Sequence, residues 1–442
     1  MKLQDKLSQS FEALGAQLNG SESETLRELR AGSFDYFQSQ GFPTNKDEEW
    51  KYTSLNKIIK RDFEFVSEES SELLLPDIAP FLCADLDAYQ LVFVNGVFNA
   101  TLSKTVVQEN FFVGSLSHGR KEMPEVFSAH YGKIADQKQS LVSLNTALAK
   151  DGAFIFVKKG AKVDKLVQIL FVNTNQNKSR MIQTRNLFVA EDRAEVQILE
   201  RHQAIDQGHM FSNSVTESSV GNMAHFKHFK VQNDLDTSTL IDSTFVKQGE
   251  KSYALVDTFA FSGELVRNNL HFEFAGPHAE AHMDAITLLK GKSLVDHHTF
   301  VDHALPNCQS NQLYKGIYDE MSKGVFNGKV MVRKNAQKTN AFQQNNNLLL
   351  SNFSSIDTKP QLEIFADDVA CSHGCTVGQL DEEALFYMQS RGIPLKEAKA
   401  FLMFAFAGDT LKNITVPKLK AQLINMVAKE LKVDLEINEV EL

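Results

Sequence analysis

The sequence predicts a mostly β protein in which a long solenoid of strands lies between two helical segments. From about Tyr89 to Asp368, short runs alternate apolar and polar residues and are separated by Gly, Asn, Asp and Pro, as in half-buried strands joined by turns. Before and after this region, apolar residues recur at helical spacing instead. We therefore expect a helical segment and connector at 1–88, a β core at 89–380 and a helical segment at 381–442.

The first segment contains a helix signal followed by a polar connector. Ser21 and Glu24 have the spacing of a capping box, and apolar residues between positions 26 and 37 keep a helical period. Gly41 is expected to end this helix. The connector that follows carries Trp50, the only tryptophan of the chain.

The length and texture of the β core restrict its architecture. The run of strands contains no helix of crossover length, which excludes a doubly wound α/β sheet. Stacked sandwiches would require two or three domains, but no Pro- or Ser-rich linker divides the run. A solenoid adds coils end to end, so that each coil buries its apolar side against its neighbours. We therefore predict an irregular β-solenoid ahead of stacked sandwiches, with one helical interruption at Val142–Lys150.

Three helices are predicted at the C-terminal end. The first, Asp381–Gly392, begins with acidic residues and stops at glycine. Pro394 is expected in the first turn of the second helix, and Pro417–Lys432 forms an amphipathic third. The second helix is apolar on nearly every face after Lys399. Either part of its surface awaits a partner protein, or the other two helices bury it completely.

Composition and charge exclude several classes of function. The formal net charge is -10, whereas a nucleic-acid surface needs clustered Lys and Arg. The longest strongly apolar run, Phe401–Gly408, is much shorter than the roughly 20 residues that cross a bilayer, and residues 1–20 contain no apolar signal core. No loop of the form G-x-x-x-x-G-K-[ST] occurs, so we expect no nucleotide on this chain. These features predict a cytoplasmic protein without nucleic-acid or membrane partners.

The four cysteines are too few for a disulfide framework and should be free thiols in a reducing compartment. Most free cysteines are packed core residues, which is the expectation for Cys83. Cys371, His373 and Cys375 are different, because they occupy alternate positions where the β core gives way to the helices. Alternate residues of an extended chain point to one face. The three residues could form a metal site, a thiol with its catalytic base, or part of an ordinary strand.

The geometry of a strand limits what this Cys-x-His-x-Cys motif can do. Neighbours on one face lie about 7 Å apart, and the two ends lie about 13 Å apart. Ligand sulfurs must approach a zinc ion to about 2.3 Å, so a straight strand cannot enclose a metal, although a turn at Gly374 could join two of the three. A nucleophilic Cys–His pair needs direct contact and an oxyanion hole, which this spacing makes awkward. A packed strand, the presentation of open ligands to a docking partner and a nucleophilic pair therefore all stay open as interpretations.

Histidines elsewhere are expected to be structural. His297 and His303 share a strand face but lie about 20 Å apart, and His298 points to the opposite side. They cannot share one metal ion without a sharp bend of the chain. His225 and His228 likewise fall on opposite faces of a strand.

Four stretches resemble one known family. Lys46–Thr53, KDEEWKYT, resembles the signature near the N-terminus of SufD-type proteins. The stretches 296–317, 324–351 and 357–393 resemble the core motifs of the SufB/SufD family, the scaffold subunits of SUF iron–sulfur cluster assembly. Such long agreement without gaps is highly specific, whereas the sequence between these stretches is compatible only in texture.

The resemblance implies a right-handed parallel β-helix between helical N- and C-terminal domains, in agreement with the solenoid predicted from the strand pattern. It also implies a complex with a SufB-type paralogue and two copies of SufC, an ABC-type ATPase, which accounts for the missing phosphate-binding loop. In the family the C-terminal helices hold the ATPase. The residues that the resemblance maps onto this docking surface are Pro394, Leu395, Ala398, Phe401, Leu402, Phe404 and Ala405.

Cluster assembly in the family is attributed to the interface between the SufB and SufD solenoids, where a SufB cysteine faces a SufD histidine. That histidine matches His373, and the preceding motif cysteine matches Cys371. Iron favours thiolate and imidazole ligands, so both residues are expected to handle iron or a nascent cluster that is transient and shared with the partner. Many relatives carry Ala at the position of Cys375, so no role carries over to it. The absence of a cysteine-rich N-terminal cluster, with Trp50 in its SufD-like context, favours SufD over SufB.

The sequence therefore predicts a non-catalytic scaffold that pairs with a SufB-like subunit and recruits SufC. Two alternatives belong to other classes. A purely structural homodimer would pair through the surface that otherwise takes SufB, and the isolated chain is expected to form such a dimer. A β-helix polysaccharide lyase or hydrolase would carry clustered carboxylates on one solenoid face, but Asp367 and Asp368 are adjacent and therefore face opposite sides of a strand.

Overall fold

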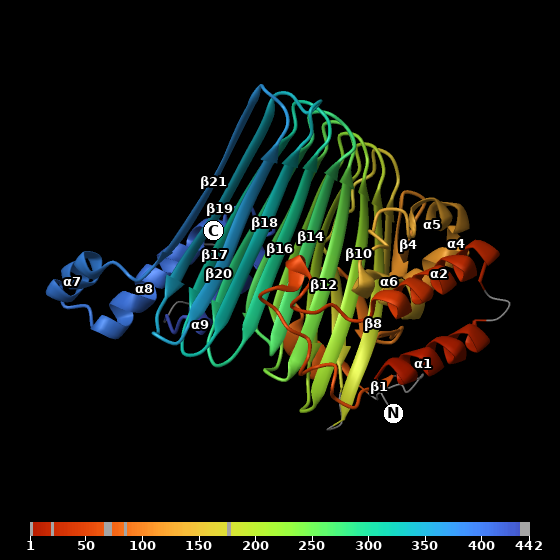
Figure 1. Ribbon diagram of the computed structural model, residues 1–442, viewed down its shortest axis with the longest axis horizontal. Helices are drawn as coiled ribbons and strands as arrows, with labels where there is room; N and C mark the ends of the chain where they lie inside the picture. Colours follow the sequence, from red (N-terminus) through yellow and green to blue (C-terminus); the bar gives the residue numbers. More distant parts are fainter. Residues whose placement is uncertain (1–2, 19–21, 66–72, 84–85, 175–177, 434–442) are drawn as a thin grey trace.

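Two large, mostly parallel sheets form the body of the molecule. The computed structural model describes all residues except 1–2, 19–21, 66–72, 84–85, 175–177 and 434–442. Successive long strands alternate between the two sheets, so the chain winds as a solenoid (Figure 1). The expected mostly β fold, with a parallel solenoid between N- and C-terminal helices, is therefore confirmed.

We name the two sheets after their main strands. The even sheet consists of β4 (Val106–Val107), β5 (Phe111–Ser115), β6 (Ala153–Val157), β8 (Ser179–Ala190), β10 (His209–Val220), β12 (Ser238–Gln248), β14 (Leu265–Phe274), β16 (Leu294–His303), β18 (Lys323–Val332) and β20 (Ser355–Ile364), and the short β1 (Glu64–Phe65) pairs with β8. The odd sheet consists of β3 (Val97–Phe98), β2 (Tyr89–Val94), β7 (Val167–Asn173), β9 (Glu195–Ala204), β11 (His225–Asn233), β13 (Tyr253–Ser262), β15 (Glu280–Leu289), β17 (Gln309–Tyr318), β19 (Thr339–Leu349) and β21 (Val369–Gly378).

Successive coils stack in regular register. Glu195 of β9 pairs with His225 of β11, which pairs in turn with Tyr253 of β13, so one coil adds roughly 30 residues. The corner before each strand from β9 to β19 of the odd sheet contains a non-glycine residue with positive φ. The N–H of each such residue donates to the matching corner of the next coil, as Arg193 does to the carbonyl of Asn222. These backbone bonds satisfy the strained corners and keep the coils in line.

The inward faces of the sheets enclose a core that is apolar near these corners and polar farther along the strands. Phe226, Val256 and Phe272 belong to the large apolar cluster. Farther along β11, the buried Lys230 donates to both carboxylate oxygens of Asp242 at 2.8 and 2.7 Å. A buried charge is tolerated only when it is paired in this way.

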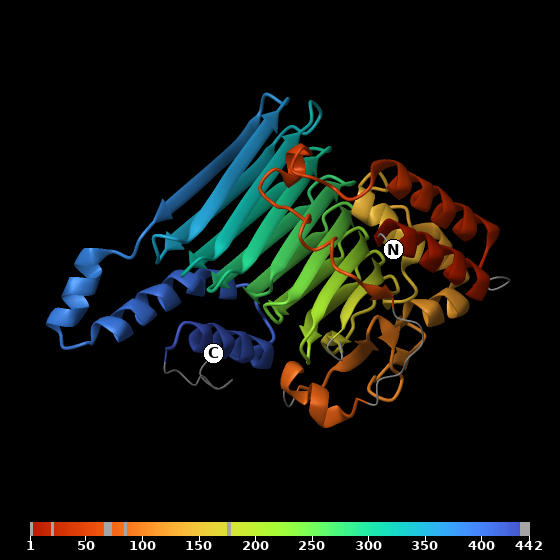
Figure 2. The same cartoon turned by 60° about the horizontal axis from the view of Figure 1, so that its bottom comes forward.

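N-terminal helices cover the end where the solenoid begins (Figures 1 and 2). The helices of this part are α1 (Leu3–Gln17), α2 (Glu24–Gln40), η1 (Glu48–Trp50), α3 (Leu75–Ile78), η2 (Ala79–Phe81), α4 (Leu116–Glu122), α5 (Pro124–His130) and α6 (Ser140–Leu148). Residues of α1, α2 and α6 share one apolar cluster with the outward face of the even sheet, and α4 and α5 pack on its first strands. The helix α6 confirms the expected interruption, whereas the sequence pattern did not predict α4 and α5.

The helix expected after Ser21 is α2, but its N-cap differs from the expected one. The hydroxyl of Ser23 accepts from the backbone N–H of Leu26 at 3.3 Å, so Ser23 caps the helix. Ser21, the expected cap, lies outside the described residues. Gly41 ends the helix as expected, with a φ of 70° that favours glycine.

The C-terminal segment contains the three helices that were predicted. They are α7 (Glu382–Ser390), α8 (Leu395–Ala407) and α9 (Pro417–Glu430), with a 3₁₀ turn η3 (Gly408–Leu411) between the last two. Pro394 is the N-cap of α8 rather than a first-turn residue, whereas Pro417 does occupy the first turn of α9. Residues of α8 and α9 pack in one apolar cluster with the outward face of the odd sheet, while α7 projects from the end of the molecule (Figure 2). Within the described residues, the helices are all too short or too polar to cross a membrane.

Candidate functional site

The solenoid ends in two strands that are unpaired on one side. Among the described strands, β20 is the last of the even sheet and β21 the last of the odd sheet. Each is ten residues long, and both lie at the end opposite the N-terminal helices (Figure 1). We call this end, formed by β20 and β21, the open end. It exposes the backbone N–H and C=O groups that would bond to a further strand.

The Cys-x-His-x-Cys motif lies on the unpaired strand β21. Cys371, His373 and Cys375 all point toward the space between the two sheets, as their alternate spacing predicted. Gly374 lies inside the strand, so the turn that could have joined two of the three residues does not form. The register partners of the three residues on β19 are the inward residues Ala341, Gln343 and Asn345.

The three side chains have different surroundings. Cys371 is half-buried against the apolar core, and burial raises the pKa of its thiol. His373 and Cys375 are exposed, and the Sγ atom of Cys375 lies 3.2 Å from the hydroxyl of Thr358 on β20. In the part of the chain that the structure describes, no three His, Cys, Asp or Glu side chains are grouped to hold a metal ion. An ion held at this row would therefore need ligands from outside these residues.

The other two cysteines are packed in the core. Burial raises the pKa of the Cys83 thiol to about 11, so this thiol stays protonated at neutral pH. Cys308 is fully buried, and its thiol donates to the carbonyl of Gly276 at 3.4 Å. Neither has the exposure or the lowered pKa of a reactive thiol.

The residues expected to dock a partner lie on α8, but they do not all face solvent. Leu402 and Phe404 are half-buried, and Phe404 packs in the cluster on the odd sheet. Ala398 is completely buried, so in this arrangement it does not belong to an exposed docking surface, contrary to expectation. The exposed members of the set are Pro394, Leu395, Phe401 and Ala405.

Two exposed aromatic residues on α7 extend this surface, and sequence reasoning missed them. Phe386 is 74% exposed and Tyr387 is 60% exposed, whereas Leu385 is the buried residue of the helix. The main packing partner of α7 is α8. Two adjacent large aromatic residues in a short helix were the available signal, because one buried face cannot accommodate both. We call Phe386, Tyr387, Leu395 and Phe401 the α7–α8 patch.

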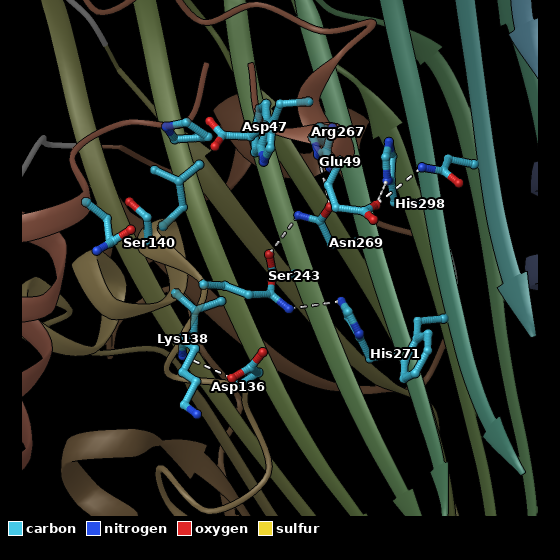
Figure 3. Close-up of a pocket in the computed structure, with 18 of the residues that line it drawn as sticks. Asp47, Glu49, Asp136, Lys138, Ser140, Ser243, Arg267, Asn269, His271 and His298 are labelled. Atoms are coloured by element: carbon cyan, nitrogen blue, oxygen red, sulfur yellow. Dashed lines mark hydrogen bonds and ion pairs between the residues drawn. The ribbon is translucent and has the colours of Figure 1, made fainter. Parts of the chain in front are cut away.

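A cavity of about 530 Å³ lies between the N-terminal connector and the outward face of the even sheet (Figure 3). The ring of Trp50 covers the guanidinium of Arg267 at 3.8 Å, and Arg267 donates to Asp296 at 2.8 Å. Gln139 and His271 approach each other at 3.3 Å lower in the same cavity. The lining contains three carboxylates and three basic side chains besides its two histidines, so it does not favour a ligand of one charge; these residues are Asp47, Glu49, Asp136, Lys138, Arg267 and Lys329.

Two sequence stretches described above, Lys46–Thr53 and the run that begins at Asp296, contact each other in the walls of this cavity. Glu49 lies 3.2 Å from His298, and the hydroxyl of Thr53 donates to Asp296. Burial by itself would raise the pKa of Asp296, but His298 and Arg267 outweigh burial and hold that pKa well below its usual range. The segment Lys46–Thr53 is therefore fixed on the sheet by the run that begins at Asp296.

Three of the other histidines are buried and hydrogen-bonded, as expected of structural residues. The ring of His297 bonds to the hydroxyl of Thr287 at 2.9 Å, and that of His303 bonds to Ser310 at 2.8 Å. Burial lowers the pKa of His297 to about 4 and that of His303 to about 3, so both rings are neutral near pH 7. His228 is completely buried beside the carboxylate of Glu200 at 3.1 Å.

The fold and the site define a solenoid protein that presents thiol and imidazole groups at an open end. The sequence matches two family models, the SufBD core domain of SUF-system FeS cluster assembly over residues 171–406 and the SufBD protein N-terminal region over residues 1–169. The chain therefore belongs to the SufBD family of the SUF system for iron–sulfur cluster assembly.

Several curated relatives resemble the chain over nearly its whole length. An iron–sulfur cluster assembly SufBD family protein of Synechocystis sp. is 32% identical over 441 residues, which is 96% of each chain. The iron–sulfur cluster assembly protein SufD of Escherichia coli is 29% identical over 424 residues, 95% of each chain. The chloroplastic protein ABCI7 of Arabidopsis thaliana is 30% identical over 433 residues, 95% of this chain and 89% of the relative.

Proposed function

We propose that this protein is a non-catalytic, SufD-type scaffold subunit. In this proposal the open end pairs with a SufB-type paralogue, the α7–α8 patch docks a SufC-type ATPase, and His373, together with Cys371, binds iron or a nascent cluster at the shared interface. The observation that carries the proposal is the position of the Cys-x-His-x-Cys row on an unpaired strand at the end of both sheets.

The open end has the properties of an interface for another sheet. Natural proteins protect exposed edge strands with charged residues, proline or bulges, because an unprotected edge recruits further strands. The sequence of β21, VACSHGCTVG, contains no charged residue and no proline, whereas β20 carries Pro360. An unprotected edge of ten residues is therefore kept available, which supports pairing with a related solenoid rather than a solvated end.

The spacing of the row supports a shared site. Cys371 and His373 are neighbours on one face, about 7 Å apart, whereas metal–ligand bonds to sulfur and imidazole are about 2.0 to 2.3 Å long. The row alone can thus give one ligand, or two with strain, and the partner must supply the others. Thiolate and imidazole are ligands that iron accepts. Because burial raises the pKa of Cys371, its thiol needs the positive charge of the metal to become a thiolate.

The α7–α8 patch supports the docking of a second partner. Phe386 and Leu395 are 74% and 45% exposed, although large apolar residues at the surface of a helical pair cost solubility. The chain lacks a phosphate-binding loop, so energy from nucleotide hydrolysis has to come from another subunit. An ATPase seated on the patch would supply it.

The role of the imidazole is tested by measuring iron and acid-labile sulfide in the wild type and in His373→Ala, each purified alone and after co-expression with SufB-type and SufC-type subunits. We expect iron only in the co-expressed complex and a severalfold loss in His373→Ala. Cys375→Ala is the matched control, because it changes an exposed residue of the same row and should leave the iron content unchanged. Equal iron content in His373→Ala and the wild type would refute this role.

The pairing of the open end is tested by placing lysine on β21. Ser372 and Gly374 are exposed, and the space around Gly374 is open, so Ser372→Lys/Gly374→Lys should fold normally while blocking the edge. We expect the SufB-type subunit to be lost from affinity-purified complexes while SufC stays bound. If the wild-type protein forms only homodimers and does not bind the SufB-type subunit, the purely structural alternative is favoured.

Docking at the patch is tested with Phe386→Asp/Phe401→Asp. Both side chains are exposed, so the fold should persist while SufC is lost and the SufB-type subunit stays bound. Leu75→Asp is the control, since Leu75 is 56% exposed on the distant helix α3. Retention of SufC by the double variant at the level of the wild type would exclude this surface.

A further inference from the structure

Gln343 is the residue beside His373 on the adjacent strand. The two are register partners in β19 and β21, so their side chains project to the same side and their Cα atoms lie about 4.8 Å apart. Gln343 is only 1% exposed, whereas the His373 ring is exposed and, within the described residues, forms no side-chain hydrogen bond. The buried amide therefore lies directly behind the imidazole of the row.

The amide of Gln343 is held from the side that faces the core. Its Nε2 donates to the Oε1 of Gln312 at 3.3 Å, and the same Oε1 accepts from the hydroxyl of Thr299 at 2.7 Å. Both glutamines are buried. Gly328 on the opposite sheet makes room for this arrangement, because a Cβ at that position would lie 2.3 Å from the Gln343 Nε2. In this ladder the amide of Gln343 turns its Nε2 toward Gln312 and its Oε1 away from it, while the Nε2 of Gln312 likewise has no partner among the described residues.

The carbonyl oxygen of Gln343 is left without a partner. Within the described residues its Oε1 is buried and accepts no hydrogen bond. A buried acceptor without a donor loses its hydration without gaining a hydrogen bond, so a donor that can reach it is favoured. A ring N–H of the neighbouring His373 is a donor of suitable chemistry and needs only rotation of an exposed side chain.

We propose that Gln343 is a positioning residue for His373, accepting a hydrogen bond from one imidazole nitrogen so that the other nitrogen points its lone pair out of the open end. Histidines that bind metals almost always donate their second ring N–H to a carbonyl or carboxylate oxygen, which fixes the tautomer and the ring orientation. The purpose of this arrangement rests on the proposed role of His373 as a ligand. Both residues belong to this chain, so the hydrogen bond between them can be measured without a metal ion or a partner subunit.

The test is the tautomer of His373, read from ¹⁵N chemical shifts of the full-length protein labelled at histidine. The spectrum is recorded at pH 8.5, where ordinary imidazoles are neutral, and the His373 signals are assigned by their loss in His373→Ala. We expect a single tautomer in the wild type and the mixture typical of a free imidazole in Gln343→Met, which keeps the side-chain length but removes the acceptor. Gln343→Glu restores an acceptor oxygen and should restore the single tautomer.

Two further variants separate positioning from general disturbance. Asn347→Ala removes another buried amide of the same strand and face, and it should leave the His373 shifts unchanged. Gly328→Ala displaces the Gln343 amide without removing it and should produce the mixture even if Gln343→Met folds poorly. A tautomer mixture in the wild type, or shifts in Gln343→Met equal to those of the wild type, would overturn the inference.

The iron content of the complex with SufB-type and SufC-type subunits supplies a second readout. We expect Gln343→Met to lower the iron content severalfold, because loss of a residue that orients a metal ligand typically weakens metal affinity by about 10- to 100-fold. Gln343→Glu should preserve the iron content. Unchanged iron in His373→Ala would refute the proposed function, whereas the tautomer experiment would still decide whether Gln343 orients the ring.

Discussion

The outward face of the odd sheet carries two carboxylates beneath the segment that joins η3 to α9. Asp284 accepts a hydrogen bond from the side chain of Asn413 at 2.7 Å, and Asp257 is its completely buried register partner. Burial raises the pKa of Asp284 to about 6, and burial together with the charge of Asp284 raises the pKa of Asp257 well above its usual range. The hydrogen bond from Asn413 to Asp284 and the charge of Lys227 near Asp257 offset this only in part.

The raised pKa of Asp284 predicts how stability depends on pH. A carboxyl group whose pKa is raised by folding binds its proton more tightly in the folded protein, so stability falls as the pH rises from the unfolded value toward the folded one. For Asp284 this window runs from 3.8 to about 6, and the penalty is fully present above it. A shift of roughly two units corresponds to about 3 kcal/mol.

We therefore expect Asp284→Asn to stabilise the protein at high pH but not at low pH. Asparagine keeps an oxygen that can accept from Asn413, while it removes the charge. Its advantage over the wild type in free energy of unfolding should grow by about 2 to 3 kcal/mol between pH 4 and pH 8. Urea unfolding followed by far-UV circular dichroism at both pH values measures this change, and hydrogen exchange of α9 shows whether the docked helix is the part that responds.

The matched control for this experiment is Asp367→Asn, which changes an exposed carboxylate in the turn before β21. Its effect should be the same at pH 4 and pH 8. If the gain in free energy of unfolding caused by Asp284→Asn is likewise independent of pH, the buried charge of Asp284 does not destabilise the folded protein, and the prediction is wrong.

Three further predictions concern the core and the thiols. Glu217→Ala should lower the free energy of unfolding by about 3 to 5 kcal/mol in urea titrations, because it leaves the buried charge of Arg185 without its carboxylate and removes the acceptor of several backbone N–H groups. A loss below about 1 kcal/mol would contradict this. Gly276→Ala should lower the melting temperature by several degrees, because its Cβ would lie 2.0 Å from a backbone nitrogen of the previous coil, and an unchanged temperature would show that the coils yield. With an aromatic disulfide reagent at pH 8, the exposed Cys375 should react rapidly, while the buried Cys83 and Cys308 should react only after unfolding. Mass spectrometry locates the modified residues. Rapid modification of Cys83 or Cys308 in the native protein would mean that the core opens.

Local pattern was sufficient to predict most of the fold. Period-two alternation identified the strands, and the lack of crossover helices left a solenoid as the simplest arrangement. The pattern did not reveal the polar interior, because Lys230 and Asp242 come from facing sheets and only the folded coil brings them together at 2.7 Å. The helices α4 and α5 were missed because their apolar residues pack against strands instead of forming a long periodic stripe.

The site was predictable to the extent that it depends on neighbours in sequence. Alternate spacing predicted that Cys371 and His373 share one face of a strand, and in β21 they occupy alternate positions on the inward face. The burial of Ala398, the exposure of Phe386 and the bond between Thr53 and Asp296 depend on packing between segments that lie far apart in the chain. No periodicity within one segment contains that information.

The geometry of paired strands supports placing the proposed ligand sharing at the open end. Successive residues on one face of a strand, such as Cys371 and His373, are about 7 Å apart, whereas register partners on adjacent strands are only about 5 Å apart. A strand of another chain that pairs with β21 would therefore bring its side chains closer to His373 than any other ligand of the row can come. Two side chains about 5 Å apart can both reach a metal at about 2.0 to 2.3 Å, which neighbours within one straight strand achieve only with distortion. In the proposed function, pairing at the edge would turn the exposed row of donors into a site, and this predicts that blocking the edge with lysine and removing the imidazole lower the iron content to the same extent.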